Sequence, residues 1–307
     1  MGVVIGDALG CPVQFESREE VAAHPVLGMR GDGTFHLPAG SWTDDSSLTL
    51  ALLDSILQTG GIYLHHVMGN FIRWLDEGEF TPYGYAYDVG YGTLDGILHY
   101  KRSHNPLKCG GCSERSNGNG SLMRILPACL YCQRQHLPDA AAIDVIHRVG
   151  SLTHAHIRSN IACGLYYFMV QAVLEEEGGL LSRLQTGLDR GFAYYGQALA
   201  DQENVEYYDR LRNLAAFRET PENAIKSSGY VVDTLEAAVW SLLQTDSFED
   251  ALLRAVNLGD DSDTVGAVAG GLAGLFYGFD AIPRPWLDAL QRRAWIEEMC
   301  DQADAIG

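Results

Sequence analysis

Apolar residues recur at three- and four-residue steps along most of this 307-residue chain. Such spacing places apolar side chains on one face of an α-helix. Between residues 46 and 59 the spaced residues are Leu48, Ala51, Leu52, Ser55 and Ile56. Glycines at 60 and 61 follow this run, and a glycine at that place is typical of a helix C-terminus. The same spacing predicts helices over residues 67–75, 143–149, 157–174, 234–243, 248–256 and 265–279. Alternating runs typical of strands are rare, so the sequence predicts an all-α fold.

The spaces between these predicted helices contain three long loops rich in glycine, asparagine or glutamate, over residues 28–40, 105–120 and 175–179. No Pro- or Ser-rich linker divides the chain, and no 20–50-residue repeat is visible. A hydrophobic content of 47% is enough for a sizeable core. We therefore expect a single domain over residues 1–307.

The charge and the apolar runs of the chain argue against nucleic acids and membranes as partners. There are 40 acidic residues against 21 Lys and Arg, a formal net charge of −19, which repels nucleic-acid phosphates and anionic lipid. The longest apolar run, residues 265–279, is shorter than the roughly 20 residues that span a membrane. The N-terminus lacks a signal-peptide pattern, and seven scattered cysteines indicate reduced thiols. The expected setting is the cytoplasm, with neither a nucleic-acid groove nor a membrane partner.

Two acidic segments share one pattern, in which a loop supplies carboxylates and hydroxyls immediately before an apolar helix. Residues 41–48 read Ser-Trp-Thr-Asp-Asp-Ser-Ser-Leu, and residues 259–265 read Gly-Asp-Asp-Ser-Asp-Thr-Val. Hard divalent cations select oxygen ligands, and a pair of ions needs several carboxylates. The pattern therefore favours a site for two divalent ions, with these candidate ligands: Thr43, Asp44, Asp45, Asp261, Asp263 and Thr264. The alternative is that the acidic residues are ordinary helix N-caps.

Three further segments are candidate parts of a site. Residues 116–124 place glycines before an apolar stretch, which suits a phosphate cradle at a helix N-terminus but equally a surface loop. Asp88 lies among tyrosines, where partial desolvation would favour a role as a general base; it could also be a helix N-cap. His154 could bind a phosphate or ribose, or be a buried structural residue.

Two CxxC pairs and one repeat of glycines are further features of the sequence. Cys109 and Cys112, with Cys129 and Cys132, have the spacing of a structural zinc site, although the second pair lies in an apolar helical run where cysteine often serves as a small hydrophobe. Glycines at 266, 270 and 274 recur on one helix face. We expect that face to press against a neighbouring helix beneath the metal cluster.

Taken together, these motifs resemble the ADP-ribosylglycohydrolase family, typified by the dinitrogenase reductase-activating glycohydrolase. They follow the family order and span nearly the whole chain. The matching segments are residues 6–10 (Gly-Asp-Ala-Leu-Gly), 42–46, 88–90, 117–124, 153–154, 229–238 and 259–266.

The resemblance implies an orthogonal multi-helix bundle around a dinuclear Mg²⁺ or Mn²⁺ centre. The metal ligands that it implies are the six candidates given above. Asp88 and Asp45 are the catalytic carboxylates that it implies, with Asp88 near the scissile bond. The substrate-binding residues that it implies are Asn119, Gly120, Ser121, His154 and Tyr230, the last beside the adenosine.

One position departs from the family pattern. Where relatives carry a glutamate that is central to catalysis in serine-directed members, this chain has Gln14, with Glu16 two residues further on. The substitution favours the arginine-directed activity. We therefore expect a metal-dependent hydrolase that cleaves the N-glycosidic bond of an ADP-ribosylated protein or small conjugate. The alternatives are a non-catalytic ADP-ribose-binding module and a hydrolase restricted to small ADP-ribose conjugates.

Overall fold

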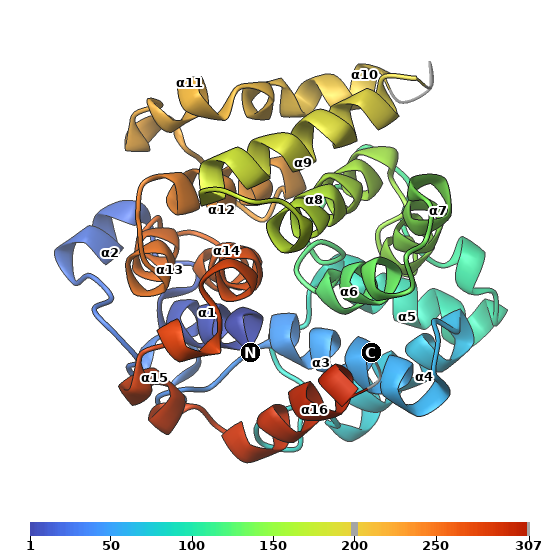
Figure 1. Ribbon diagram of the computed structural model, residues 1–307. Helices are drawn as coiled ribbons and strands as arrows, with labels where there is room; N and C mark the ends of the chain where they lie inside the picture. Colours follow the sequence, from blue (N-terminus) through green and yellow to red (C-terminus); the bar gives the residue numbers. More distant parts are fainter. Residues whose placement is uncertain (198–201, 306–307) are drawn as a thin grey trace.

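The computed structural model describes residues 1–197 and 202–305, and these two ranges contain sixteen α-helices and no strand. Backbone pairing of the β type is limited there to three isolated bridges. The predicted all-α fold is confirmed (Figure 1). The helices are α1 Gly2–Gly10, α2 Arg18–Ala23, α3 Asp44–Thr59, α4 Leu64–Glu77, α5 Tyr91–Ser103, α6 Leu126–Arg134, α7 Asp139–Gly150, α8 Ile157–Glu175, α9 Leu180–Tyr195, α10 Gln202–Val205, α11 Leu214–Arg218, α12 Val231–Leu243, α13 Phe248–Val256, α14 Ser262–Tyr277, α15 Arg284–Ala289 and α16 Arg293–Ala305.

Each helix predicted from the apolar spacing is present, and several begin earlier than predicted. Helix α3 begins at Asp44, and α14 begins at Ser262. Their first turns are polar, so the apolar spacing could not include them. Helix α1 has no predicted counterpart because all nine of its residues are buried, and a helix without a polar face has no amphipathic period.

The glycine face of α14 packs against α1, which carries its own glycines at positions 2, 6 and 10 (Figure 1). A Cβ atom added at Gly266 would lie 2.5 Å from the carbonyl oxygen of Gly6, and one added at Gly6 would overlap the carbonyl of Gly266. Only glycine on both helices permits this approach. The predicted scaffold role of the α14 glycines is confirmed, and their partner is the first helix of the chain.

Substituting Gly6→Ala is expected to destabilise the protein by about 3 kcal/mol or more, since neither backbone can yield without separating α1 from α14. Chemical denaturation would measure the change in the free energy of unfolding. The matched control is Gly69→Ala in α4, where an added Cβ meets no atom within 4 Å and the expected change is below about 1 kcal/mol. Equal effects of the two substitutions would contradict this account of the contact.

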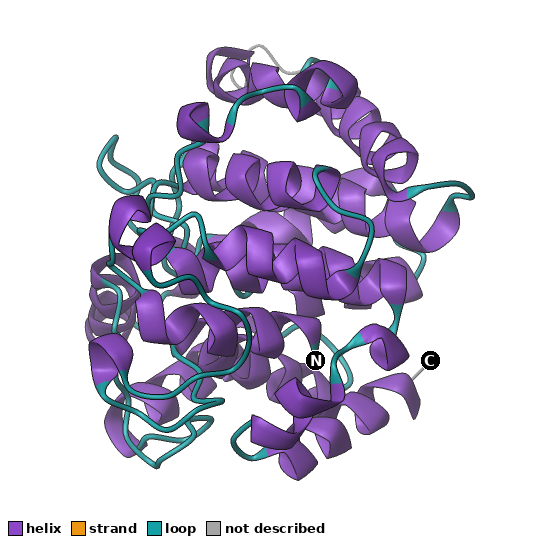
Figure 2. Cartoon of the chain, turned by 90° about the vertical axis from the view of Figure 1, so that its left-hand side faces the viewer, coloured by secondary structure: helices purple, strands orange, loops and turns teal. Residues whose placement is uncertain are grey.

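Many of the loops lie on one side of the helical array, and others lie across its front and on the opposite side (Figure 2). The loops predicted over residues 28–40 and 105–120 are present, each with one 3₁₀ turn, and the third covers residues 176–179 because α8 ends at Glu175. All seven cysteines lie in the described part of the chain and are free thiols, as predicted. In that part, no helix combines the length and apolar character needed to cross a bilayer.

Candidate active site

Asp7 of α1 caps the N-terminus of α3. Its carboxylate is fully buried and accepts hydrogen bonds from the backbone N–H groups of Thr43 and Ser46, each at 3.0 Å. Thr43 is the N-cap residue of α3, yet its own side chain makes no capping bond. Because Asp7 satisfies these amides, Asp44 and Asp45 are not needed as caps. The N-cap alternative is therefore wrong for the first acidic segment.

The two acidic segments, more than 200 positions apart in the chain, meet in one cluster. The Thr43 hydroxyl lies 3.3 Å from Asp263 Oδ2, and the Thr264 hydroxyl lies 3.3 Å from Asp45 Oδ2. Asp261 occupies the N-cap position of α14 without a side-chain capping bond. Asp261 therefore stands where the N-cap alternative places it, but its side chain does not cap the helix. The first turns of α3 and α14 point their carboxylates at each other.

Burial and mutual repulsion dominate the electrostatics of this cluster. Desolvation by burial, followed by the neighbouring carboxylates, raises the pKa of Asp44, Asp45 and Asp263 well above the ordinary range. One oxygen each of Asp45 and Asp263 is buried without a hydrogen-bond partner. Unpaired buried carboxylates are costly unless a cation joins them. Their oxygen-only donor set fits hard divalent cations.

The side chains of the carboxylate cluster do not converge on one point in this structure. In residues 1–197 and 202–305, no three carboxylate, imidazole or thiolate groups converge closely enough to hold a metal ion. Ion binding would therefore require the carboxylates to turn towards a shared centre.

Asp88 lies in the loop before α5, in a left-handed backbone conformation with φ of +52°. Gly90, not Asp88, is the N-cap residue of α5, so the N-cap alternative is wrong here as well. Gln14 Nε2 donates a hydrogen bond to Asp88 Oδ2 at 2.9 Å. Burial raises the pKa of Asp88 to about 6, while this hydrogen bond opposes the shift. Gln14 thus orients the carboxylate, and Glu16 does not line the cleft described below.

A cleft of about 910 Å³ opens above the carboxylate cluster. Thr43 and Asp263 lie beneath its floor, and Ser121 is buried behind its wall against Cys163. The predicted residues that line it are Asp44, Asp45, Asp88, Asn119, Gly120, His154, Asp261 and Thr264.

Backbone pairing joins the segments predicted to bind substrate. Gly111 pairs with His154, and Gly118 pairs with Tyr230, in two isolated bridges. The Asn119 N–H donates to the Gly229 carbonyl at 3.1 Å, while the Asn119 amide donates to Asp261 at 2.5 Å. The loop therefore connects the carboxylate cluster to the start of α12.

Glycines in this loop and at the start of α5 leave space for the His154 ring. An added Cβ at Gly120 would lie 2.7 Å from the His154 ring, and one at Gly92 would lie 2.6 Å from it. Burial lowers the pKa of His154 to about 3, so the imidazole is neutral. Helix α6 begins only at Leu126, five residues after Ser121. The expected phosphate cradle at a helix N-terminus is therefore wrong in its helical part.

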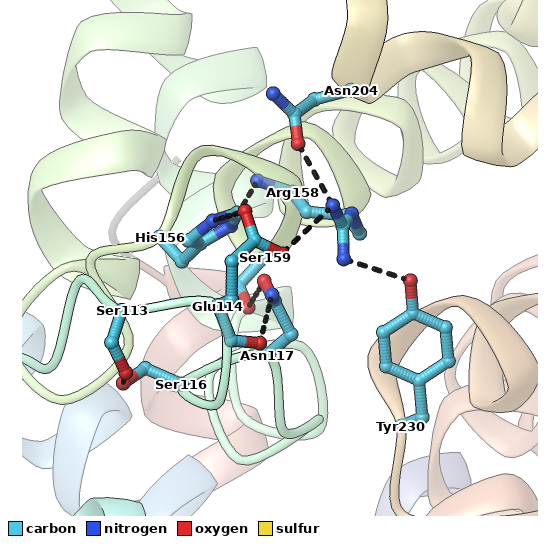
Figure 3. Close-up of polar contacts among 9 residues, drawn as sticks. All are labelled: Ser113, Glu114, Ser116, Asn117, His156, Arg158, Ser159, Asn204 and Tyr230. Carbon is cyan, nitrogen blue, oxygen red and sulfur yellow. Dashed lines mark hydrogen bonds and ion pairs between the residues drawn. The ribbon is translucent and has the colours of Figure 1, made fainter.

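Tyr230 does not line the cleft, and its hydroxyl accepts a hydrogen bond from the buried side chain of Arg158 (Figure 3). Arg158 Nη1 donates to the Tyr230 hydroxyl at 3.2 Å, and Arg158 Nη2 donates to Glu114 Oε2 at 3.3 Å. Glu114 also lies 3.2 Å from His156 Nε2, while Ser159 contacts Asn117. This network ties the loop before Asn119 to α8 and to the start of α12.

The two CxxC pairs occupy separate surroundings. Cys109 hydrogen-bonds to the carbonyls of Pro106 and Leu152, and Cys112 is exposed. Cys129 and Cys132 are buried on α6, where they pack as small apolar residues. Since the described residues hold no converging group of three such ligands, the structure does not support the zinc hypothesis.

Sequence reasoning missed two residues of the site. Asp7 was identifiable as a lone carboxylate inside an apolar helical run, since a buried charge there requires dedicated partners. Arg115 is an exposed residue that lines the cleft. Its signal was a basic residue next to the serines, glycines and asparagines of residues 116–121.

Comparison with known proteins gives a consistent result. The family model described as ADP-ribosylglycohydrolase matches residues 1–306. The chain is 32% identical to ADP-ribosylarginine hydrolase Tri1 of Serratia proteamaculans, covering 98% of this chain and 76% of that one. It is 30% identical to ADP-ribosyl-[dinitrogen reductase] glycohydrolase of Rhodospirillum rubrum, covering 100% and 93%. A solved structure, "ADP-ribosylglycohydrolase-related protein complex", superposes with a TM-score of 0.76 at 33% identity, covering 99% and 94%.

Proposed function

Because the chain belongs to the ADP-ribosylglycohydrolase family, we propose that it hydrolyses the N-glycosidic bond between ADP-ribose and an arginine side chain. The observation that carries the proposal is a cluster of buried, uncompensated aspartates at the floor of a large cleft. Gln14 supports arginine over serine linkages, since it presents a neutral amide that holds Asp88 where serine-directed relatives have a glutamate.

The proposed cofactors are two Mg²⁺ or Mn²⁺ ions. Their oxygen ligands would come from Thr43, Asp44, Asp45, Asp261, Asp263 and Thr264, whose unpaired buried oxygens fit hard cations. When bound, such ions would supply Lewis-acid chemistry that lowers the pKa of a water molecule and so makes it a better nucleophile. The carboxylates at the cleft floor would face the positive charge that develops on the ribose.

The residues of the chain supply the remaining functions. Asp88, with a pKa near 6, accepts a proton from the attacking water or transfers one to the departing guanidine. Asp45 orients that water from the cleft floor. Asn119, Gly120 and neutral His154 hold the ADP-ribose by hydrogen bonds and close packing. Ser121 and Tyr230 support this wall from behind.

The direct test is incubation of the purified protein with ADP-ribosyl-arginine and Mg²⁺, with EDTA as the control. Release of ADP-ribose that depends on the metal is the expected result. An absence of release, or release that EDTA leaves unchanged, would contradict the proposal. Tight ADP-ribose binding without hydrolysis of arginine, serine or acetyl-ester conjugates would instead identify a binding module. Turnover of small conjugates but not of ADP-ribosylated protein would identify a small-molecule hydrolase.

The ion pairs of Glu114 give a prediction about the substrate-binding loop. Substituting Glu114→Gln is expected to weaken ADP-ribose binding about two- to fivefold, because the loop loses its charged contacts to Arg158 and His156. Calorimetric titration would measure the dissociation constant. The control is Glu222→Gln, which breaks an ion pair with the exposed Arg254 away from the cleft. Identical affinities for both variants would show that the loop is positioned without Glu114.

We further propose that the enzyme acts as one domain in the cytoplasm, on an ADP-ribosylated protein or a small ADP-ribose conjugate. The acidic composition supports a substrate whose leaving group is cationic.

A further inference from the structure

A run of aromatic rings begins at Phe15, which lines the cleft, and continues to the tyrosines that precede Asp88 in the chain. The ring centroids of Phe15 and Phe35 are 6.5 Å apart, and those of Phe35 and Tyr87 are 5.5 Å apart. Tyr85 and then Tyr83 continue the run at 5.9 and 6.2 Å. Phe15 follows Gln14 in the chain, and Tyr87 precedes Asp88. The rings therefore flank the hydrogen bond that orients the proposed catalytic carboxylate.

The Phe15 side chain is exposed to solvent and does not pack in the core. Its side chain lines the cleft, yet the residue is 66% exposed. Its φ of +68° is a conformation that a bulky residue rarely adopts. The strain is held by reciprocal backbone bonds, since Phe15 N–H donates to the Asp260 carbonyl and Asp260 N–H donates to the Glu16 carbonyl, both at 2.7 Å. Strained, exposed residues of this kind cluster at ligand-binding sites.

Contacts behind Phe15 hold the run in place. The Thr34 hydroxyl donates to the Gln14 carbonyl at 2.5 Å, which places Phe35 beside Phe15. Tyr87 donates its hydroxyl to the Trp42 carbonyl, and the Tyr83 hydroxyl lies 2.6 Å from Ser41. The aromatic run is thereby anchored to the loop that leads into α3, so its position relative to the carboxylates is set.

The charge around Phe15 selects a cation. Two of the aspartates that line the cleft are tied to the Phe15 segment and are not assigned to the metal ions. Asp88 accepts a hydrogen bond from Gln14, and the Asp260 backbone pairs with that of Phe15. A guanidinium group is planar and weakly hydrated, and it stacks on aromatic faces with a carboxylate nearby. Asp261 accepts a hydrogen bond from Asn119, in the loop assigned to ADP-ribose, and it also contacts Gln14. The group of Gln14, Asp88 and Asp261 therefore lies between that loop and Phe15, which follows Gln14 in the chain.

We propose that Phe15, backed by Phe35 and Tyr87, is the platform on which the guanidinium of the ADP-ribosylated arginine stacks while Asp88 faces the scissile bond. This inference rests on the proposed function and specifies how the target side chain is recognised. Phe15 then determines the preference for arginine linkages without contacting the ADP-ribose.

The test separates the two halves of the substrate. Agmatine, an arginine analogue, is titrated against the protein with saturating ADP-ribose and Mg²⁺, and KM is measured with ADP-ribosyl-arginine. We expect Phe15→Ala to weaken agmatine binding and raise KM about five- to tenfold, with the dissociation constant of ADP-ribose unchanged. Phe15→Trp should restore both values, whereas Phe15→Leu, which keeps apolar bulk without a ring, should not.

Tyr63→Ala is the matched control, because Tyr63 is 60% exposed but does not line the cleft. Unchanged agmatine binding in Phe15→Ala, or restoration by Phe15→Leu, would overturn the inference. A parallel loss of ADP-ribose affinity would also overturn it, since Phe15 would then stack on the adenine. If the unaltered protein releases no ADP-ribose, the proposed function fails; normal turnover with an unaffected Phe15→Ala variant rejects only the platform.

Discussion

Replacing Asp45 with Asn is expected to lower kcat/KM by about a thousandfold or more and, at the same time, to raise the melting temperature of the metal-free protein. Loss of a metal-ligating carboxylate removes several kcal/mol of transition-state stabilisation. Without metal, however, the Asp45 carboxylate is buried beside Asp7 and Asp44, which repel it. Asparagine has the same shape without the charge, so an increase of about 2 °C or more is expected.

Thermal melts in EDTA and in Mg²⁺ would measure the stability of each protein without and with metal, and initial rates would measure kcat/KM. The unaltered protein should gain stability from Mg²⁺, because an ion that binds only the folded state shifts the equilibrium towards it. The Asp45→Asn variant should gain much less. Asp280→Asn, an exposed position outside the cleft, serves as the control and should behave like the unaltered protein. An Asp45→Asn variant that melts lower in EDTA, or gains as much from Mg²⁺, would contradict the metal-site assignment.

Replacing Asp88 with Asn is expected to reduce kcat by about 10²- to 10⁴-fold while ADP-ribose and Mg²⁺ still bind. Asparagine can keep a contact with Gln14 but cannot accept a proton from water at neutral pH. The carboxylate is suited to that transfer because burial brings its pKa to about 6. Asp88 is outside the set assigned to the metals, so metal-induced stabilisation should persist.

Single-turnover kinetics with ADP-ribosyl-arginine would isolate the chemical step, and calorimetry would report ligand binding. Asp95→Asn is the matched control, since Asp95 also lines the cleft but is exposed on α5. It should retain near-normal turnover. If Asp88→Asn turned over normally, or lost Mg²⁺ binding together with activity, Asp88 would not be the proton-transfer residue.

Much of the site was predictable from local sequence because its chemistry is concentrated in short segments. The pairs Asp44–Asp45 and Asp261–Asp263 each stand at the start of an apolar helix, and the helical period was evident in α3 and α14. The glycines of α14 also predicted a close helix contact. Each of these features depends on residues within a few positions of one another, which a pattern of spacing can reveal.

Other features depended on residues distant in the chain. Asp7 looks like an isolated charge until α1 packs on α14 and brings it to the first amides of α3. Tyr230 was predicted to contact the substrate, and only the fold shows that its hydroxyl accepts a hydrogen bond from Arg158 and that it does not line the cleft. The glycines at 118 and 120 suggested a phosphate loop, but they make room for His154.

The sequence by itself determined the helical fold class, seven of the sixteen helices in the described residues and the acidic segments, because helical periodicity and helix starts are encoded locally. Only the tertiary structure decided which carboxylates remain unpaired, which residues line the cleft, and that Phe15 stands exposed beside Asp88. Burial, hydrogen-bond partners and desolvation arise when segments hundreds of residues apart pack together, so local spacing cannot specify them.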